Sequence, residues 1–329
     1  MKLRWLLLGL LVTVLLVPAG LLTTARLLDL PGGTWVRLVS FAPYAVVLYA
    51  AALLLLLPAW WRGKRFWRAT SKLLVVASLL GLLLHAFWAS GPYLGTPAAE
   101  AAGKHRLHVM TTNLRIGQAN TSRVVEVALA GDVDVLVLEE VTPQALSGLE
   151  GAGLGQAFPH HVGQPADGPA GTMVFSRYRV SHVHRLRTEF GGYGLDLATP
   201  AGRVHLIAVH PRPPVGDVSG WRVDHGVIRH AARATSERTL VVGDLNATMD
   251  HLPMRALVGS GFEDAATQAD SRWQPTWPAA GVVSRLGLSV PSMVPIDHVL
   301  VSSGLRALRT DSVTVEGTDH RALLAVVAL

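Results

Sequence analysis

The chain has 329 residues, is half hydrophobic and contains no cysteine, which excludes a disulfide framework, a thiolate nucleophile and a cysteine-based zinc site. Its net charge of +6 is unevenly divided, because residues 1–104 hold 10 basic and 2 acidic side chains (+8), whereas residues 105–329 hold 19 and 21 (−2). The basic surplus therefore belongs to the first third of the chain, and the rest shows no basic face of the kind that grips nucleic acid.

Three apolar runs dominate the first 90 residues, at 3–22, 41–61 and 73–90. Each is about as long as a helix that crosses a hydrocarbon core, roughly 17–25 residues. None carries the polar stripe of a helix on a soluble protein, so we predict three transmembrane helices within residues 1–90. The third run is the shortest and includes His85. Because the first run follows Lys2 and Arg4, a cleaved signal peptide is the alternative for that segment.

The loops between these runs predict the orientation of the chain. The segment 62–72 carries five basic side chains, whereas 23–40 carries two arginines and one aspartate. The positive-inside rule therefore places the N-terminus and 62–72 in the cytoplasm, and three crossings leave everything after about residue 90 outside. We expect a multi-pass protein of the cell membrane, with the lipid bilayer as its partner and its large C-terminal region on the extracytoplasmic side.

Residues 91–104, GPYLGTPAAEAAGK, are small and rich in proline, glycine and alanine, which is typical of a linker. Residues 105–329 follow, enough for one sizeable domain, and contain no internal repeat. Strands are predicted at 105–114, 133–140, 171–176, 194–199, 203–210, 238–244, 296–302, 307–315 and 321–328, and helices near 121–131, 142–150, 219–236 and 253–259. Many short Val/Leu/Ile strands mixed with few helices predict an α/β layered sandwich. The aperiodic stretch 265–295 is predicted to be a long functional loop.

Six of these strands carry acids, amides or histidines at one end. The residues concerned are Asn113, Glu139, Glu140, His210, Asp244, Asn246, Asp297, His298, Asp319 and His320. Asp244 and Asn246, two residues apart, would lie on the same face of an extended strand. A plain turn is the alternative for this Gly-Asp-x-Asn stretch, since all three residue types favour turns. Six such strand ends are too many for an accident of packing and predict a functional site.

The ordered set resembles the endonuclease/exonuclease/phosphatase superfamily, the magnesium-dependent phosphoesterases related to deoxyribonuclease I. The resemblance spans residues 105–329 and rests most on Gly-Asp-x-Asn at 243–246 and on the final Asp-His at 319–320. Two departures are Glu139, where the family usually has glutamine, and Thr318, where it usually has serine. The resemblance implies a four-layer α/β sandwich of the deoxyribonuclease I type behind the three membrane helices.

The family's chemistry implies a role for each matching residue. Glu140 would bind Mg²⁺, with Mn²⁺ as the alternative metal, assisted by Asn113 and Asp319, since hard cations take oxygen ligands. Asp244 would polarise the attacking water, and Asn246 would hold water or substrate in line.

His320 would contact the phosphate or exchange a proton, and Asp297 would fix its tautomer and orientation. His210 is the histidine expected on a strand of the site. The alternatives to a functional role are a strand-end cap for Asn113, a surface position for His210 and a turn for the Asp-His pair at 319–320. Asp250 and His251 fall outside the pattern and are expected on the surface or in a loop.

Location narrows the substrate. A domain tethered to the outer face of a membrane is suited to a phosphate at the bilayer surface, and its acidity disfavours DNA. Three spans followed by such a domain resemble the actinobacterial membrane phosphoesterases associated with vancomycin and teicoplanin resistance. This implies undecaprenyl diphosphate or a related lipid carrier as substrate, and a role in glycopeptide antibiotic resistance. The alternatives are an extracellular metal-dependent nuclease, which should show Lys/Arg clusters near the site, and a non-catalytic membrane-tethered binding module. The sequence does not indicate an oligomeric state.

Overall fold

The computed structural model forms two compact units, Met1–Gly91 and Pro92–Leu329. It describes residues 2–62, 65–91, 105–235, 238–271, 273–279, 281, 284–285 and 288–329. Of the predicted linker at 91–104, only Gly91 lies among the described residues. Each unit has hydrophobic clusters of its own and is considered separately.

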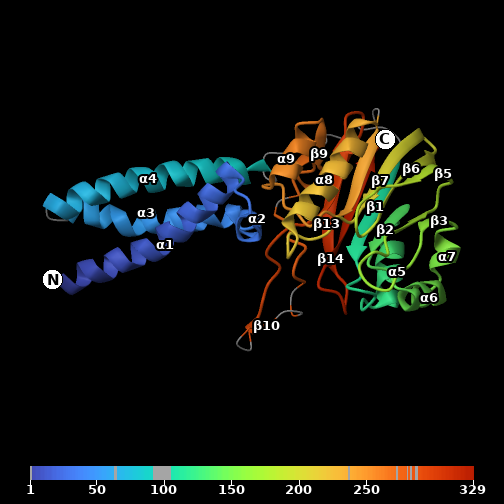
Figure 1. Ribbon diagram of the computed structural model, residues 1–329, viewed down its shortest axis with the longest axis horizontal. Coiled ribbons are helices and arrows are strands. Elements are labelled where there is room, and N and C mark those ends of the chain that lie inside the picture. The colour runs from blue at the N-terminus through green and yellow to red at the C-terminus, as the bar shows by residue number, and fades with distance from the viewer. Residues whose placement is uncertain are drawn as a thin grey trace. The chain divides into compact units, whose positions relative to one another are not determined.

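The first unit is helical. Its elements are α1 (Lys2–Leu28), α2 (Gly33–Val39), the 3₁₀ helix η1 (Ala42–Tyr44), α3 (Ala45–Arg62) and α4 (Arg65–Ala89) (Figure 1). Three segments are long and apolar enough to cross a membrane: Leu3–Leu28, Ala42–Trp61 and Arg68–Ala89. Many of their leucines are exposed, which suits a lipid surround, whereas small residues such as Ala19, Ala45 and Ala52 are buried where helices meet.

His85, the one histidine of the third apolar run, is buried within the helical unit. Its Nδ1 lies 2.9 Å from the carbonyl oxygen of Ala42, and its Nε2 lies 2.9 Å from Thr23 Oγ1. Thr23 Oγ1 also lies 2.8 Å from the hydroxyl of Tyr49. The imidazole therefore has a partner at each nitrogen, which removes the cost of an unsatisfied polar group among apolar helices.

The second unit contains two six-stranded mixed sheets. The first has the order β13-β14-β1-β2-β4-β3, with bounds β1 (Arg106–Asn113), β2 (Val135–Glu139), β3 (His160–Gly163), β4 (Met173–Ser176), β13 (Arg306–Thr314) and β14 (Arg321–Ala328). The second has the order β5-β6-β7-β8-β12-β9, with bounds β5 (Val180–Arg185), β6 (Gly192–Thr199), β7 (Gly202–Val209), β8 (Thr239–Asp244), β9 (Phe262–Asp264) and β12 (Asp297–Ser302). A two-stranded ribbon joins β10 (Ser284–Arg285) to β11 (Leu288–Ser289).

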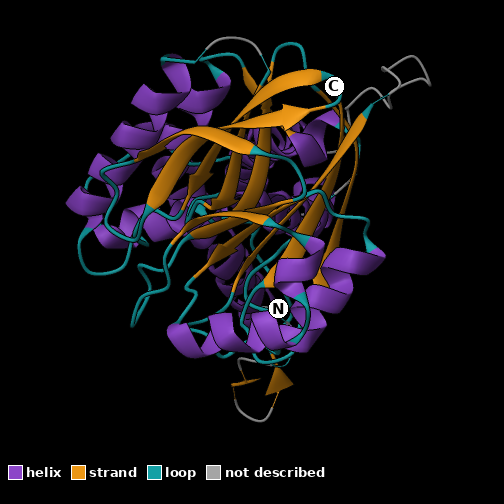
Figure 2. Cartoon of the chain, turned by 90° about the vertical axis from the view of Figure 1, so that its right-hand side faces the viewer, coloured by secondary structure: helices purple, strands orange, loops and turns teal. Residues whose placement is uncertain are grey.

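Helices cover the outer faces of the two sheets (Figure 2). They are α5 (Thr121–Ala130), α6 (Pro143–Gly151), α7 (Leu154–Ala157), α8 (Val218–Arg233) and α9 (Leu252–Val258). The short α10 (Ala265–Gln268) instead packs against the core between the sheets through Ala265. The three longer helices, α5, α6 and α8, each begin at an N-cap residue. Asn120, Thr142 and Asp217 cap them by accepting a hydrogen bond from a backbone N–H in the first turn. The predicted four-layer α/β sandwich is therefore confirmed.

The core follows from the alternation of side chains along each strand. In β1, Leu107 and Val109 face the second sheet and join a cluster that includes Leu206 of β7 and Leu240 of β8. The intervening Met110 faces outward into a second cluster with α5 and α6. Both faces of the first sheet are thus buried, as an internal sheet requires.

All nine predicted strands are present, and their ends differ from the prediction by no more than two residues. The prediction missed β3, β5 and β9, which lie at sheet edges. β5 shows why, since its side chains are almost all exposed and lack an apolar alternation. The stretch 265–295, predicted as one loop, also contains α10 and the β10–β11 ribbon.

Candidate active site

The candidate site continues the core between the sheets. The side chains that alternate toward this core run from apolar to polar at one end: Val109, Thr111 and Asn113 in β1, Val137 and Glu139 in β2, Ala208 and His210 at the end of β7, Val242 and Asp244 in β8, and Asp297 and Val299 in β12. Period-2 alternation therefore brings these polar groups together from both sheets. Together they form a largely buried cluster at one end of the sandwich.

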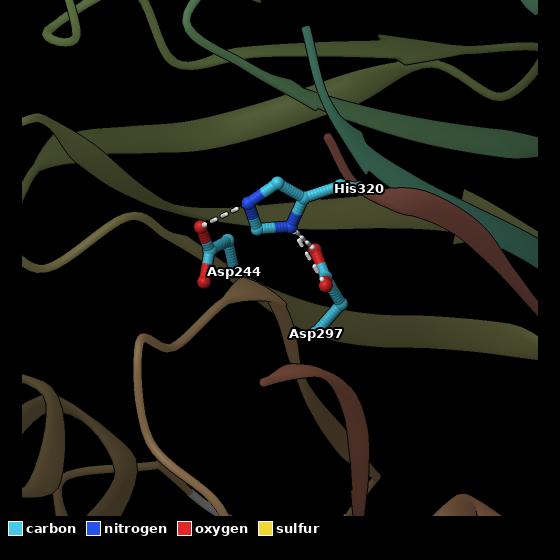
Figure 3. Close-up of side chains that lie close together, drawn as sticks. All are labelled: Asp244, Asp297 and His320. Atoms are coloured by element: carbon cyan, nitrogen blue, oxygen red, sulfur yellow. Dashed lines mark hydrogen bonds and ion pairs between the residues drawn. The ribbon is translucent and has the colours of Figure 1, made fainter. Parts of the chain in front are cut away.

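Asp297, His320 and Asp244 lie at the centre of the cluster (Figure 3). Asp297 and Asp244 are register partners across the antiparallel pair β12 and β8. His320 Nδ1 lies 2.9 and 3.1 Å from the two carboxylate oxygens of Asp297, and its Nε2 lies 3.6 Å from Asp244 Oδ2. The contact that the motifs predict between Asp297 and His320 is present, and the imidazole sits between two buried carboxyl groups.

The charge of His320 follows from these neighbours. Burial lowers the pKa of the imidazole, but the carboxylates of Asp297 and Asp244 outweigh burial and raise it to about 10. Below that pH both ring nitrogens carry a proton, so His320 is a donor at Nδ1 and Nε2. Burial raises the pKa of Asp244, and the charged His320 opposes that rise.

These three residues are also the group whose potential metal-ligating atoms lie closest, all within 4.8 Å of one another. Both ring nitrogens of His320 are already directed at carboxylates, however, Nδ1 at Asp297 and Nε2 at Asp244. We therefore interpret Asp297–His320–Asp244 as a buried ion-pair chain, and look for the metal position beside it.

Glu140 and Asn113 provide that position. Asn113 Nδ2 donates to Glu140 Oε1 at 3.0 Å and to Asp244 Oδ2 at 3.1 Å, so one amide bridges both acids. Glu140 Oε2 accepts from the backbone N–H of Ile116 at 2.6 Å. Glu140 has a φ of 58°, a left-handed conformation that costs a non-glycine residue about 1 kcal/mol and is found at functional sites. Its side chain is 16% exposed, which leaves the carboxylate open to solvent.

The residues present fit a divalent cation. Asp244 and Asp297 share the imidazolium of His320, and Asp319 lies beside Arg115. Among the described residues, Glu140 has only His210 as a basic side chain near it, at 3.9 Å, and a 2+ ion would offset this surplus of acid. All of these ligands are oxygens, which suits a hard cation. Glu140 and Asn113 would hold it, and it would supply charge for the non-bridging oxygens of a phosphate.

Asp319 occupies a different position from the predicted metal ligand pair. Its Oδ2 accepts from Trp277 Nε1 at 3.2 Å, and its Oδ1 lies 4.0 Å from Arg115 Nε. Among the described residues, no hydrogen bond or ion pair joins it to Glu140 or Asn113. Its role as a metal ligand therefore stays a prediction.

His210 is buried, so the surface interpretation of this residue is wrong. Its Nδ1 lies 3.2 Å from the carbonyl oxygen of Pro169, which assigns the proton to Nδ1. Its Nε2 lies 3.6 Å from Asp244 Oδ2 and 3.9 Å from Glu140 Oε1. Burial lowers the pKa of His210, so the ring is neutral and its Nε2 can accept a hydrogen bond from water or substrate.

Asn246 lies beside Asp244 in a turn beyond the end of β8, as the turn alternative for Gly-Asp-x-Asn predicts, and its role in a site stays a prediction. Asp244 Oδ1 accepts from the backbone N–H of Asn246 at 2.8 Å, which is a side-chain-closed turn. Asn246 Nδ2 lies 3.5 Å from Asp244 Oδ2 and donates to the carbonyl of Pro211 at 3.1 Å. The turn holds Asn246 at a φ of 48° and places its carboxamide next to the carboxylate.

The segment 245–248 is held from outside by three aromatic rings. Trp221 Nε1 donates to the carbonyl of Asn246 at 3.1 Å, and His298 Nε2 lies 3.0 Å from the carbonyl of Ala247. His251 Nδ1 accepts from the backbone N–H of Thr248 at 2.9 Å. His251 is therefore a buried support of this segment. Asp250 and His251 lie in the loop before α9, as expected, but both are buried rather than on the surface.

Glu139 is fully buried behind the cluster. Its Oε1 accepts from Thr111 Oγ1 at 2.8 Å, and its Oε2 has no hydrogen-bond partner among the described residues. Burial raises its pKa well above the ordinary value, and the carboxylates of Asp297 and Asp244 reinforce the rise. The side chain is therefore a neutral acid, close in shape and polarity to the glutamine it replaces.

Trp277, Thr276 and Arg115 reach the site without having been predicted as site residues. Thr276 Oγ1 accepts from the backbone N–H of Asp297 at 3.2 Å, and Trp277 donates to Asp319. The only sequence signal for the first two was the QPTWP stretch within the aperiodic segment 265–295. Sequence spacing offers no means of aligning such a segment with strands far along the chain.

Comparisons with known proteins agree with this geometry. The model of the endonuclease/exonuclease/phosphatase family matches residues 110–320. Curated proteins give no match. Among solved structures, D. rerio TDP2 complexed with a single-strand DNA product is 13% identical, with a TM-score of 0.57 over 69% of this chain and 100% of that one. An endonuclease/exonuclease/phosphatase from Beutenbergia cavernae DSM 12333 is 18% identical, with a TM-score of 0.53 over 69% and 72%.

Truncated Caenorhabditis elegans TDP2 is 14% identical, with a TM-score of 0.52 over 68% of this chain and 98% of that chain. At such identities these structures establish the fold. The family match covers well over half of the sequence and includes every predicted site residue. The chain therefore belongs to the endonuclease/exonuclease/phosphatase family.

Proposed function

We propose that this protein is a membrane-anchored, extracytoplasmic, metal-dependent phosphatase that acts on a phosphate carried by a membrane lipid, such as undecaprenyl diphosphate or a related lipid carrier. The observation that carries the catalytic part is the buried Asp297–His320–Asp244 chain beside Glu140. Buried ionisable groups with strongly shifted pKa values in one cluster are typical of catalytic sites.

The protonation states divide the chemical work. His320 keeps its proton below pH 10 and thus acts as a donor to a phosphate oxygen or as the acid for the leaving group, with Asp297 fixing the ring. A protonated imidazole is no base, so Asp244 takes that role toward the attacking water. Asn246 and the neutral His210 flank Asp244 and would hold water or substrate in line. A cation at Glu140 and Asn113, Mg²⁺ by the chemistry of the ligands, would offset phosphate charge.

The lipid substrate is supported by the first unit and by charge. Three candidate spans precede the domain, and five basic residues at 62–72 favour an outward-facing domain. Several arginines of the domain are already neutralised, such as Arg212 by Glu189 and Asp217, and Arg203 by Asp196. Neutralised arginines contribute little to binding a nucleic acid backbone.

The test is phosphate release by the purified full-length chain in lipid nanodiscs. Undecaprenyl diphosphate, DNA and an inositol phosphate would be compared, each after chelation and after restoring Mg²⁺. We expect Mg²⁺-dependent release from the lipid diphosphate, and loss of release with Asp244→Asn. Cleavage of DNA alone would establish the nuclease alternative. Inactivity on all three, with a divalent ion bound, would favour a binding module.

A further inference from the structure

A second surface, distant from the catalytic chemistry, lies on the outer face of the second sheet. A groove of about 820 Å³ runs between the edge strand β5 and helix α8. Its floor is apolar and includes Leu186, Val223 and Val227. Val223 is 62% exposed, so its side chain is accessible from outside the groove.

Basic side chains surround this floor. His184, Arg185 and Arg187 line the groove from the β5 side, and His230 lines it from α8. None of the described lining residues is acidic. The combination is thus an apolar strip with a cationic border, which occurs where a protein meets an interface that is anionic on its surface and apolar beneath.

Arg185 and Arg187 carry the positive charge of this border. Both are exposed, and neither forms an ion pair with any described residue, whereas Arg212 contacts three carboxylates. Asp196, which lies 2.7 Å from the lining residue His205, forms no ion pair with either arginine. The two guanidinium groups are therefore available to an external anion.

We propose that the groove between β5 and α8 is a docking surface for an anionic phospholipid bilayer. The two arginines would bind lipid phosphates, for which guanidinium geometry is well matched, and the exposed valine would insert among the upper parts of the acyl chains. Charge complementarity supports this occupant over a neutral one.

The tether supports it as well. The candidate spans end at Ala89, and the 14 residues from 91 to 104 reach about 50 Å when fully extended. The domain is therefore always close to a lipid surface, and a weak cationic face is enough to select one orientation. This inference does not depend on the reaction proposed above.

The absence of native cysteine allows a direct test. Val223→Cys and, as a control, Leu129→Cys would each be labelled with a fluorophore in the full-length chain. Leu129 is 46% exposed on α5, in the helical layer on the other sheet. The labelled proteins would be reconstituted in vesicles whose headgroups carry a nitroxide quencher, with either phosphatidylglycerol or only phosphatidylcholine as the host lipid.

We expect the Val223 label to be quenched more than the Leu129 label in phosphatidylglycerol, and equally in phosphatidylcholine. The charge reversal Arg185→Glu with Arg187→Glu should weaken docking by roughly fivefold for each arginine, and Arg185→Lys with Arg187→Lys should retain it. If the charge-reversal variant does not fold, the neutral variant Arg185→Gln with Arg187→Gln is used in its place. Equal quenching of both labels in phosphatidylglycerol overturns the proposal. So does protection of the Val223 label by single-stranded DNA in phosphatidylcholine, which would identify a nucleic acid surface.

Discussion

Replacing Asp297 by asparagine is expected to convert a pH-insensitive catalytic donor into a pH-sensitive one. The pKa of His320 stands at about 10 against an ordinary value of 6.5, a preference for the charged ring of ~5 kcal/mol. The carboxylate of Asp297 is the largest contribution that raises it, and burial works in the opposite direction. Without that carboxylate, and with Asp244 still opposing burial, we expect the pKa of His320 to fall toward its ordinary value of 6.5.

The magnitude follows from the protonated fraction. At pH 8 a ring with a pKa of about 6.5 is only about 3% protonated, so kcat should fall roughly thirtyfold, whereas at pH 6 the loss should be small. The assay is a kcat–pH profile of wild type and Asp297→Asn, together with a ¹⁵N NMR titration of His320. His320→Gln should lose about 10²–10⁴ in kcat at every pH, and the double variant should lose scarcely more, because the two residues act as one unit.

Stability has a matching pH dependence. Because the folded pKa of His320 is raised, its stabilising contribution is fully present below pH 6.5 and is lost as pH rises from 6.5 through 10. Asp297→Asn should flatten this part of the unfolding curve. If Asp297→Asn loses activity equally at pH 6 and pH 8, or if the two losses add in free energy, the pairing of Asp297 with His320 is not what sets the protonation of the site.

Three further outcomes are expected. Glu140→Ala and Asp244→Ala should each abolish phosphate release in a folded protein, and activity within about tenfold of wild type would remove that residue from the site. Glu139→Gln should change kcat by less than about threefold, since the native side chain is already neutral. It should also raise the unfolding temperature at neutral pH, because the wild-type protein loses stability as the pH rises from the ordinary pKa of Glu139 to its raised pKa in the folded state. A collapse of activity would show that Glu139 holds the metal. A reporter fused after Leu329 should behave as extracytoplasmic, and cytoplasmic reporter activity would refute the orientation drawn from residues 62–72.

Strand ends were the part of the site that the sequence could predict. An apolar run with an acid or histidine at its end fixes both the strand and the direction of the polar side chain, so Asp244 and Asp297 could be placed without a structure. The pairing of Asp297 with His320 followed from the family resemblance, whereas the register of β8 and β12 is what brings Asp244 beside Asp297. Edge strand β5 was not predicted, because its almost fully exposed residues show no alternation of apolar and polar side chains.

Support from outside the sandwich could not be predicted. Asp250 and His251 follow a strand end closely but point away from the strand pattern, so nothing in their spacing distinguishes a buried support from a solvated turn. The same holds for Trp277, whose indole reaches Asp319 from a segment without periodicity. Such contacts join residues that are far apart in the sequence. They depend on how the layers of the sandwich pack on one another, which local sequence patterns do not determine.

The rings around segment 245–248 carry a consequence for how the protein tolerates damage. Three side chains of the outer layer, Trp221, His251 and His298, fix the backbone on which the Asn246 carboxamide is mounted. A substitution at one of these side chains leaves the inter-sheet core intact, so the fold would be kept while the Asn246 carboxamide loses its fixed position. On heating, activity should therefore be lost several degrees below the unfolding temperature of the sheets, and the rate of amide hydrogen exchange at 245–248 should rise first. Variants selected for heat resistance of activity would be expected to accumulate in α8 and α9, far from any reacting atom.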